Sequence, residues 1–259
     1  MTDLDYSIEA LSDLIVKSEK LVVFTGAGIS TESGIPDFRG PEGLWTKYDP
    51  EEFTIQKFIS STESRKMQWK MLTEAGLTTE AKPNPAHHAI AELHQLGKLD
   101  CIITQNVDNL HQKAGVPQDK VFELHGNMQW VICLSCHRRF PINEILQKIH
   151  EGIEVPDCPH CHGILKPDAV FFGEALPQAT LAEATRRARS CDLLIVVGST
   201  LVVYPAAYMP MYAKEAGARL AIVNLGDTPL DLYATVVIRG KAGEIMSKVM
   251  ERVRSKISS

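Results

Sequence analysis

The stretch GAGISTESGIPDFRG, from Gly26 to Gly40, directly follows the apolar run Leu21 to Thr25. A buried strand that runs into a glycine turn and a helix start lets backbone N–H groups approach a pyrophosphate closely. Gly26 and Gly28 fill the first two positions of the GxGxxG pattern of dinucleotide-binding folds, whereas Thr31 replaces the third glycine. The turn therefore predicts a dinucleotide site that departs from the usual redox fingerprint.

The size and charge of the chain narrow the possible classes of protein. A length of 259 residues suits one large domain or one domain with a small insert. The net charge of -5 gives no electrostatic reason for tight binding to nucleic acid. The N-terminus lacks the cationic and apolar regions of a signal peptide, and no apolar run is long enough for a membrane span. We expect a cytoplasmic protein without a membrane partner.

Apolar strands alternate with amphipathic helices along most of the chain. This pattern predicts an α/β fold with a doubly wound, Rossmann-like parallel sheet covered on both faces. The predicted strands are Leu21–Thr25, Leu99–Thr104, Val121–Leu124, Ala169–Phe172, Leu193–Val197, Leu220–Asn224 and Thr235–Ile238. The predicted helices include Pro85–Leu96, Leu181–Ser190, Ala206–Ala216 and Glu244–Lys256, with one more before the first strand.

Two segments interrupt this alternation of strands and helices. Residues 40–82 contain several aromatic residues but no clear strand, and they predict a small helical insert with a cofactor loop. Residues 127–167 carry four cysteines and predict a second insert that folds around a metal, because it is too small for a core of its own. The predicted dinucleotide-binding domain then comprises residues 1–39, 83–126 and 168–259.

Four of the six cysteines form two CxxC pairs, Cys133/Cys136 and Cys158/Cys161. Four thiolates at this spacing suit a tetrahedral Zn²⁺, and they leave no coordination position for water, so we expect a structural zinc. Three histidines flank the pairs and could replace a ligand: His137, His160 and His162. Cys101 and Cys191 border apolar runs and are expected to be small buried hydrophobic residues.

A zinc ribbon is also found in nucleic-acid-binding modules, which keeps a second class of function open. That class predicts a basic face. The segment Cys133–Cys161 carries Arg138, Arg139 and Lys148 together with several acids instead of a basic stripe. We therefore expect no direct binding of nucleic acid.

The second informative stretch is TQNVDNLH, residues 104–111, which follows a predicted strand. Its polar side chains fall at the carboxyl end of that strand, where open α/β sheets bind ligands. Gln105, Asn106 and Asp108 offer amides and a carboxylate suited to a ribose and a carboxamide. The alternative is a turn in which Asn and Asp make local hydrogen bonds.

The stretch FELHG places His125 at the end of another short strand, again at the carboxyl edge of the sheet. Histidine exchanges protons near neutrality, which makes His125 a candidate general base. The chain has nine histidines, most of which must be structural or on the surface. Further along, Gly198 and Ser199 follow a strand and predict a second close-backbone turn, or simply a strand end.

In their order along the chain, these motifs resemble those of the sirtuins, the NAD-dependent protein deacylases, over nearly the whole span from Leu21 to Gly243. The resemblance implies contacts with NAD from Gly26, Ala27, Gly28, Thr31, Asp37, Phe38, Arg39, Gln105, Asn106, Val107, Asp108, Gly198, Ser199, Thr200, Asn224, Leu225, Gly226 and Ala242. It also implies that an acetyl-lysine peptide adds as a strand between two segments, contacting Val107, Val170, Phe172, Gly173, Glu174, Val202, Val203 and Tyr204.

The resemblance further implies the reaction. NAD is a consumed co-substrate whose nicotinamide lies near Asn106 and Asp108, and the acyl oxygen of the lysine amide attacks the nicotinamide ribose. His125 then acts as the general base on the ribose hydroxyls. The products are nicotinamide, O-acetyl-ADP-ribose and the deacetylated lysine.

Alternatives remain within the enzymes. A redox dehydrogenase predicts a complete GxGxxG and a second strand closed by an acidic residue about twenty positions on. Thr31 and the absence of such a strand disfavour it. Mono-ADP-ribosyl transfer shares every motif and stays open.

The sequence also allows a prediction of which acyl group is removed from the lysine. The resemblance implies that removal of acidic acyl groups requires a Tyr-x-x-Arg pair, and no tyrosine of this chain has an arginine three positions later. The residues expected around the acyl chain, Val107, Val170 and Phe172, are apolar. We expect a preference for acetyl, with Arg65 in the helical insert as the residue that could oppose it.

Overall fold

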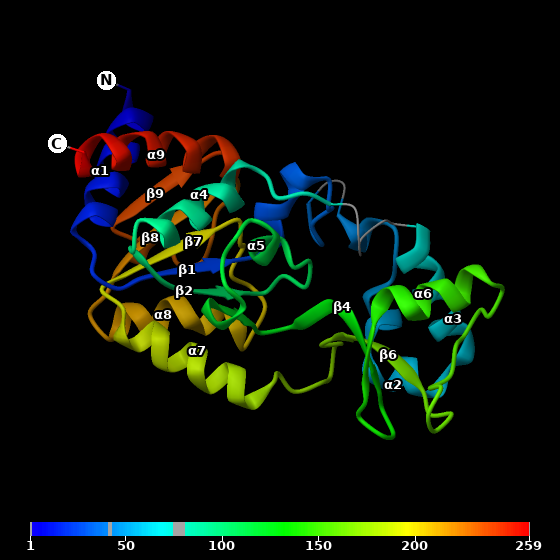
Figure 1. The fold of residues 1–259 in the computed structure, drawn as a ribbon. Helices are drawn as coiled ribbons and strands as arrows, with labels where there is room; N and C mark the ends of the chain where they lie inside the picture. Colours follow the sequence, from blue (N-terminus) through cyan, green and yellow to red (C-terminus); the bar gives the residue numbers. More distant parts are fainter. Residues whose placement is uncertain (1, 41–42, 75–80, 259) are drawn as a thin grey trace.

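In the computed structural model, which describes residues 2–40, 43–74 and 81–258, a six-stranded parallel sheet forms the larger lobe (Figure 1). Its strand order is β3-β2-β1-β7-β8-β9. The strands are β1 (Leu21–Thr25), β2 (Leu99–Thr104), β3 (Val121–Glu123), β7 (Leu193–Val197), β8 (Arg219–Asn224) and β9 (Val236–Arg239). The predicted fold class, a doubly wound α/β sheet, is confirmed.

The central strands are buried on both faces, which explains why they read as continuous apolar runs. Side chains of β1 alternate between the two faces: Leu21 and Val23 pack into one core cluster, and Val22 and Phe24 into the other. This alternation follows from the two-residue period of a strand. The sheet therefore needs an apolar helix layer on each side.

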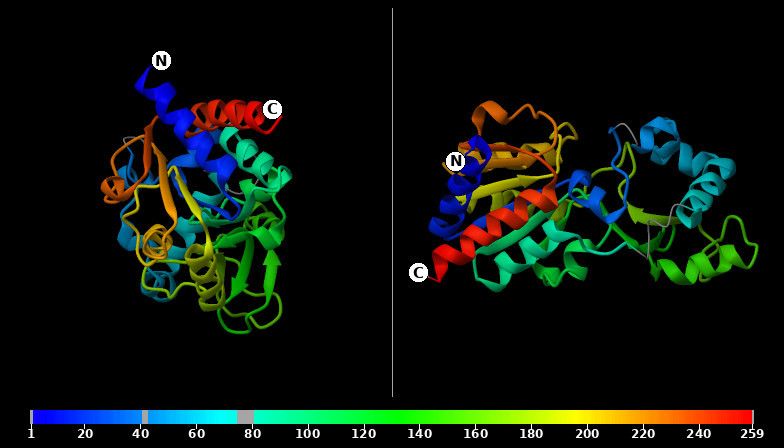
Figure 2. Two further views of the ribbon diagram at one scale, coloured as in Figure 1. Left: turned by 90° about the vertical axis from the view of Figure 1, so that its left-hand side faces the viewer. Right: turned by 90° about the horizontal axis from the view of Figure 1, so that it is seen from above.

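Helices supply those two layers. One face is covered by α1 (Asp3–Lys17), α4 (Pro85–Gln95) and α9 (Ala242–Ile257), and the other by α7 (Gln178–Ser190) and α8 (Met209–Glu215) (Figures 1 and 2). The buried residues of α9 recur at helical spacing, as Ile245, Met246, Val249 and Val253 do. In the described residues, no helix combines the length and the apolar character that a membrane span requires.

The winding of the sheet creates a switch point between β1 and β7. From β1 the chain moves outward to β2 and β3, and it later returns to β7, which pairs with β1 on its other side. It then continues outward to β8 and β9. Ligands of open α/β sheets bind at the carboxyl ends of strands at such a point.

The smaller lobe combines the two interrupting segments. An antiparallel sheet has the order β5-β4-β6, from β4 (Gly126–Cys133), β5 (Arg139–Pro141) and β6 (Leu165–Ala169). The helices of the lobe are α2 (Ile55–Ser60), α3 (Thr62–Glu74) and α6 (Ile142–His150). The remaining short elements of the described residues, from both lobes, are η1 (Ala27–Ser33), η2 (Leu44–Thr46), η3 (Pro50–Phe53), α5 (Leu110–Lys113), η4 (Gln118–Lys120), η5 (Ala206–Tyr208) and η6 (Asp231–Tyr233).

The two inserts share a single core. Trp69 of α3, 1% exposed, packs in one cluster with Val131 of β4 and with Ile142 and Ile145 of α6. The cysteine module therefore gains from the helical insert a core that it is too short to build alone. The predicted boundaries of the three parts stay a prediction, and residues 41–42 and 75–80 of the predicted helical insert lie outside the described residues.

One predicted strand is wrong. Ala169–Phe172 was expected in the parallel sheet, but the strand in this region is β6, which ends at Ala169 and pairs antiparallel with β4. Lys166, Pro167 and Asp168 do not read as a strand, yet β6 is an edge strand, where a proline is tolerated. The strands β4 and β5 were not predicted, because their cysteines and turns dominate the local pattern.

Candidate active site

The turns after β1 and β7 contact each other through glycine backbone. The N–H of Gly28 donates to the carbonyl of Gly198 at 2.9 Å, and the N–H of Gly26 donates to that of Val197 at 3.3 Å. A Cβ added to Gly198, whose φ is +64°, would lie 2.1 Å from the backbone N of Ile29. The glycines are thus required to let the two turns meet. The N–H groups of Gly26 and Gly28 are thus used within the protein, and a contact of the turn with a pyrophosphate through its other backbone atoms stays a prediction.

A polar cluster forms where η1 meets the loop after β2. The side-chain amide of Asn106 donates to the hydroxyl of Ser30 at 3.1 Å, and that hydroxyl donates to Oδ2 of Asp108 at 2.7 Å. Burial raises the pKa of Asp108 above the ordinary carboxyl value, and hydrogen bonds from Leu110 N–H and Ser30 partly offset this. Asn106 and Asp108 thus share one partner, Ser30, which sequence reasoning missed although it lies within the glycine motif.

A buried chain of hydroxyl groups fixes the backbone of Asn106. Its N–H donates to Oγ1 of Thr104 at 3.0 Å, and Thr25 Oγ1 lies 2.8 Å from Thr104 Oγ1. Nε2 of the buried His111 lies 2.9 Å from Thr25 Oγ1. The loop after β2 is therefore held in place by buried side chains of β1, β2 and α5.

Gln105 joins two loops of the site. Its side-chain amide donates to Oγ of Ser199 at 2.8 Å, which ties the loop after β2 to the loop after β7. Its backbone carbonyl lies 2.9 Å from Nδ1 of His125. One residue therefore sets the position of both a turn and the candidate base.

His125 has a defined tautomer. A carbonyl oxygen only accepts hydrogen bonds, so Nδ1 of His125 carries the hydrogen in its contact with Gln105. In the neutral ring, Nε2 is then the basic atom. Burial lowers the pKa of His125 below its ordinary value of 6.5, and the hydrogen bond to Gln105 partly offsets this. The ring is thus neutral and able to accept a proton at Nε2 at neutral pH.

The segment Val170–Gly173 runs beside His125. The N–H of Val170 donates to the carbonyl of His125 at 2.8 Å. On the insert side, the N–H of Phe172 donates to the carbonyl of Phe53 at 3.0 Å, and the carbonyl of Phe172 accepts from Ile55 N–H at 3.0 Å. Within the described part of the chain, the backbone groups of Gly173 have no hydrogen-bond partner, and the same holds for Val202 after β7. Two segments thus carry backbone groups that an added strand could pair with.

The side chains expected to border the substrate peptide differ in how they are held. Tyr204 is 56% exposed, and Val202 and Phe172 are also exposed. Oε2 of Glu174, in contrast, accepts from Lys166 Nζ at 2.9 Å and from Phe171 N–H at 2.7 Å. A direct contact of the Glu174 carboxylate with a substrate stays a prediction.

The predicted cofactor loop contacts this segment through aromatic rings. The carboxylate of Asp37 accepts from Gly40 N–H at 2.7 Å, and Trp45 N–H donates to the carbonyl of Phe38 at 3.1 Å. The ring of Trp45 lies 5.2 Å from that of Phe38 and 5.8 Å from that of Phe172, measured between centroids. Trp45 was not among the predicted site residues; the sequence signal that could have found it is the gathering of aromatic residues in the insert directly after Phe38.

Further predicted residues end or follow β8 and β9 at the same edge of the sheet. Asn224 ends β8 and donates to the carbonyl of Gly226 at 2.9 Å, while Leu225 is 72% exposed. The side chain of Ala242, at the start of α9, is buried. Glu32 of η1 accepts from the N–H of Gly243 at 2.6 Å, which joins the glycine motif to the start of α9.

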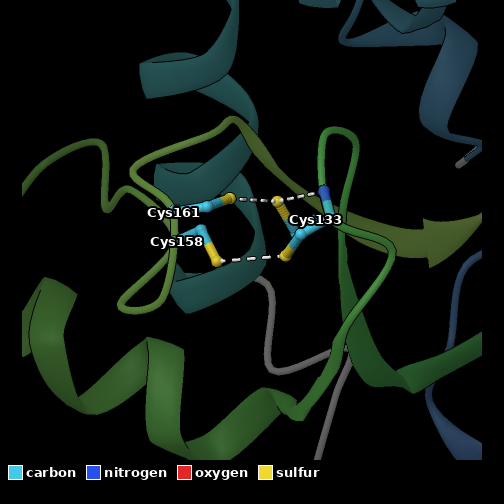
Figure 3. A group of neighbouring side chains, drawn as sticks. Cys133, Cys158 and Cys161 are labelled. Atoms are coloured by element: carbon cyan, nitrogen blue, oxygen red, sulfur yellow. Dashed lines mark hydrogen bonds between the residues drawn. The ribbon is translucent and has the colours of Figure 1, made fainter.

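The four cysteines of the CxxC pairs converge in the smaller lobe (Figure 3). Their sulfur atoms all lie within 4.8 Å of one another, with 3.5 Å between Cys133 and Cys161 and 3.8 Å between Cys136 and Cys158. Tetrahedral Zn–S bonds of about 2.3 Å place sulfurs about 3.8 Å apart, so the group fits Zn²⁺.

The turns around the cysteines are alike. His137 and His162 each follow the second cysteine of a pair, adopt a φ of +58°, and donate their N–H to the carbonyls of Cys133 and Cys158. Among the described residues, the group that can hold a metal consists of the four cysteines, without the flanking histidines. Four thiolates saturate a tetrahedral ion, which fits a structural zinc.

Comparison with known proteins assigns the family. A sequence profile of the Sir2 family matches residues 26–205. The chain is 44% identical over 248 residues to "NAD-dependent protein deacetylase 1" of Pyrobaculum aerophilum, covering 95% of each chain. It is 47% identical over 248 residues to "NAD-dependent protein deacylase 2" of Archaeoglobus fulgidus, covering 95% of this chain and 96% of that one.

A solved structure shares the fold. The structure described as "Sir2-p53 peptide-NAD+" has a TM-score of 0.87 and 40% sequence identity, and the match covers 96% of this chain and 99% of that chain. The chain therefore belongs to the Sir2 family. The resemblance to the sirtuins that the motifs indicated is confirmed.

The zinc group generates a prediction about stability. Replacing Cys133 with Ser should release the metal and unfold the smaller lobe, because structural zinc contributes on the order of 10 kcal/mol to the folding of such modules. Metal content measured by atomic emission and thermal unfolding check this result. Cys191→Ala, which alters a buried thiol outside the group, should keep one zinc per chain. A metal-free Cys133→Ser protein with the thermal midpoint of the wild type would contradict a structural role.

Proposed function

We propose that this chain is an NAD-dependent deacetylase of protein lysine residues. The observation that carries the proposal is the oriented base: Nε2 of His125 is available for a proton, and His125 is hydrogen-bonded to Gln105, next to Asn106, and to the Val170–Gly173 segment, whose Gly173 backbone has no partner among the described residues. The relatives are described as NAD-dependent protein deacetylases and deacylases, and a neighbouring structure as a complex with a peptide and NAD+. Both substrates would meet at the carboxyl edge of the sheet.

NAD would lie across the turns that follow β1 and β7. The contacts that we propose for it are the residues that the family motifs imply, from Gly26 to Arg39, Gln105 to Asp108, Gly198 to Thr200, Asn224 to Gly226, and Ala242. Asn106 and Asp108 would hold the nicotinamide end, and the exposed Leu225 the adenosine end. The buried side chain of Ala242 leaves its backbone as the available contact. When bound, NAD supplies a ribose carbon from which nicotinamide can leave.

His125 would remove a proton from a ribose hydroxyl. The carbonyl of Gln105 accepts from Nδ1–H, so it would orient the ring and stabilise the imidazolium that forms after proton transfer. Phe38, on the loop anchored by Trp45, would exclude water from the reacting atoms. The overall reaction releases nicotinamide, the free lysine and O-acetyl-ADP-ribose, with one water consumed.

The protein substrate would bind as an added strand. Gly173 on one side and Val202 on the other present backbone groups that an extended peptide can pair with. Val107, Val170, Phe172, Val203, Tyr204 and Glu174 would border the peptide and its acyl-lysine. In this binding mode the peptide is recognised through its backbone, which favours an extended and exposed segment of the protein substrate.

The acyl pocket would favour acetyl. The residues proposed around the acyl chain are apolar, and the guanidinium of Arg65 is already engaged. It donates to the carbonyls of Phe58 at 2.8 Å and Ile59 at 2.9 Å, at the end of α2. These hydrogen bonds hold the Arg65 side chain at the end of α2, so we expect it not to reach an acidic acyl group.

The function is tested by incubating the protein with NAD and an acetyl-lysine peptide. Nicotinamide release should depend on the peptide, and the peptide should lose the mass of one acetyl group. His125→Ala should reduce this turnover by a factor of about 10² to 10⁴, because it removes a general base. His88→Ala, which changes an exposed histidine, should leave it unchanged. A gain of ADP-ribose on the peptide or on the protein, without loss of acetyl, would instead indicate transferase activity.

The pH profile tests the state of His125. The base must be neutral to act, and burial lowers its pKa below 6.5. As the pH rises, kcat/KM should therefore increase through a midpoint below 6.5 and become level near neutrality, since this parameter reports groups of the free enzyme. Turnover is measured on the acetyl peptide over the range in which the protein stays folded. An acidic limb centred above pH 7 would contradict the assignment.

The acyl preference is tested with one peptide carrying acetyl-lysine or succinyl-lysine. Burial of a succinyl carboxylate among apolar side chains without a cation costs on the order of several kcal/mol. The value of kcat/KM should therefore favour acetyl by about 100-fold or more. An Arg65→Met variant, tested in parallel, should show the same ratio. A higher kcat/KM for the succinyl peptide would refute the expected pocket.

A further inference from the structure

Lys166 is a buried cation that the proposed chemistry does not use. It lies on β6, opposite Ile132 of β4, and is 4% exposed. Its ammonium donates to the carbonyl of Ala169 at 2.6 Å, to the carbonyl of Pro167 at 3.3 Å and to Oε2 of Glu174 at 2.9 Å. An ammonium has three donors, so the charge is fully hydrogen-bonded.

All three partners belong to one short stretch, residues 167–174. The chain bends around the ammonium, and Oε2 of Glu174 also accepts from the N–H of Phe171 at 2.7 Å. The ring of Phe171 lies over the ammonium, with 4.4 Å between Nζ and the ring centroid. Lys166 therefore holds both ends and the middle of a loop that begins at the edge strand and contains Val170–Gly173.

The same loop meets the rest of the protein on two further sides. Val170 pairs with the backbone of His125, and Phe172 pairs with Phe53 and Ile55 of the helical insert. The ring of Phe171 contacts the ring of Phe58 edge to face, with centroids 5.2 Å apart. The loop is thus a joint between the candidate base, the insert and the smaller sheet, and the Lys166 ammonium lies inside this joint.

Stability alone does not account for this charge. A buried ion pair contributes little net stability, because removing two charges from water costs about as much as their attraction returns. Apolar residues of similar volume would fill the same space. A charge with three fixed acceptors, in contrast, defines one conformation of the loop around it.

We infer that Lys166 is a positioning residue for the protein substrate: it fixes Val170–Gly173 in the conformation that receives the substrate strand. The inference rests on the proposed function, since it concerns the same peptide groove. Removing the Lys166 ammonium should therefore affect binding of the peptide and not binding of NAD. Loss of the ammonium should loosen the backbone edge at Gly173 while leaving the NAD contacts after β1, β2 and β7 in place.

The experiment compares Lys166→Met with Lys166→Arg, using steady-state kinetics in which NAD and an acetyl-lysine peptide are varied separately. Lys166→Met should raise the KM for the peptide by about tenfold or more, because displacement of a positioning group by about 1 Å has large effects. The KM for NAD should change by less than about twofold. Lys166→Arg, which keeps the positive charge and offers N–H donors to the same acceptors, should recover most of the affinity for the peptide.

Controls separate a positioning role from a structural one. Lys148→Met, on α6 of the same lobe, should match the wild type in both KM values. Zinc content and the thermal midpoint are measured for each variant. If Lys166→Met does not fold, Lys166→Gln, which keeps an amide donor toward the same carbonyls, takes its place in the comparison.

The outcomes distinguish this inference from the proposed function. A wild-type protein that does not turn over NAD with the peptide refutes the function itself. An active wild type together with an unchanged peptide KM in the Lys166→Met or Lys166→Gln variant overturns the inference. An equal rise in both KM values also overturns it, since it would mark a general loss of structure.

Discussion

The contact between the turns after β1 and β7 is the constraint on which the site depends. The N–H of Gly28 donates to the carbonyl of Gly198, and no side chain fits between the two backbones. Because the turns touch, Ser30 reaches Asp108 and Ser199 reaches Gln105. A side chain at either glycine would separate the loops that carry the polar groups. The glycine motif therefore assembles the site before it contacts any ligand.

The smaller lobe depends on two sources of order that act together. The cysteines draw two hairpin turns to one point, and Trp69 inserts from the helical insert into the core behind them. Each of the two segments is short for a domain, and neither would bury enough apolar surface alone. Their shared core also places α2 beside Phe171 and Phe172. The zinc group thus supports, at a distance, one wall of the proposed peptide groove.

Backbone hydrogen bonds hold the loop that connects the two lobes. The backbone of Val170 pairs with that of His125, and the backbone of Phe172 pairs with the insert. A short loop therefore connects the candidate base with the part of the insert that we propose to lie beside the peptide. Lys166 and Glu174 hold this loop from the inside with charge-assisted hydrogen bonds, which are shorter and stronger than neutral ones. The aromatic contact of Trp45 with Phe38 and Phe172 adds the cofactor loop to the same joint.

The sequence by itself determined the parallel sheet, the zinc group and the polar loops, because each has a local pattern: apolar runs, CxxC spacing, and Asn, Asp or His directly after a strand. The family followed from the order of those motifs. Only the tertiary structure decided that Gly26 and Gly28 use their N–H groups internally, that β6 replaces the expected strand at Ala169–Phe172, and that Arg65 is engaged at the end of α2. It alone brought Lys166 to its three acceptors. These features depend on which distant backbone groups come into contact, and no local pattern of side chains encodes that.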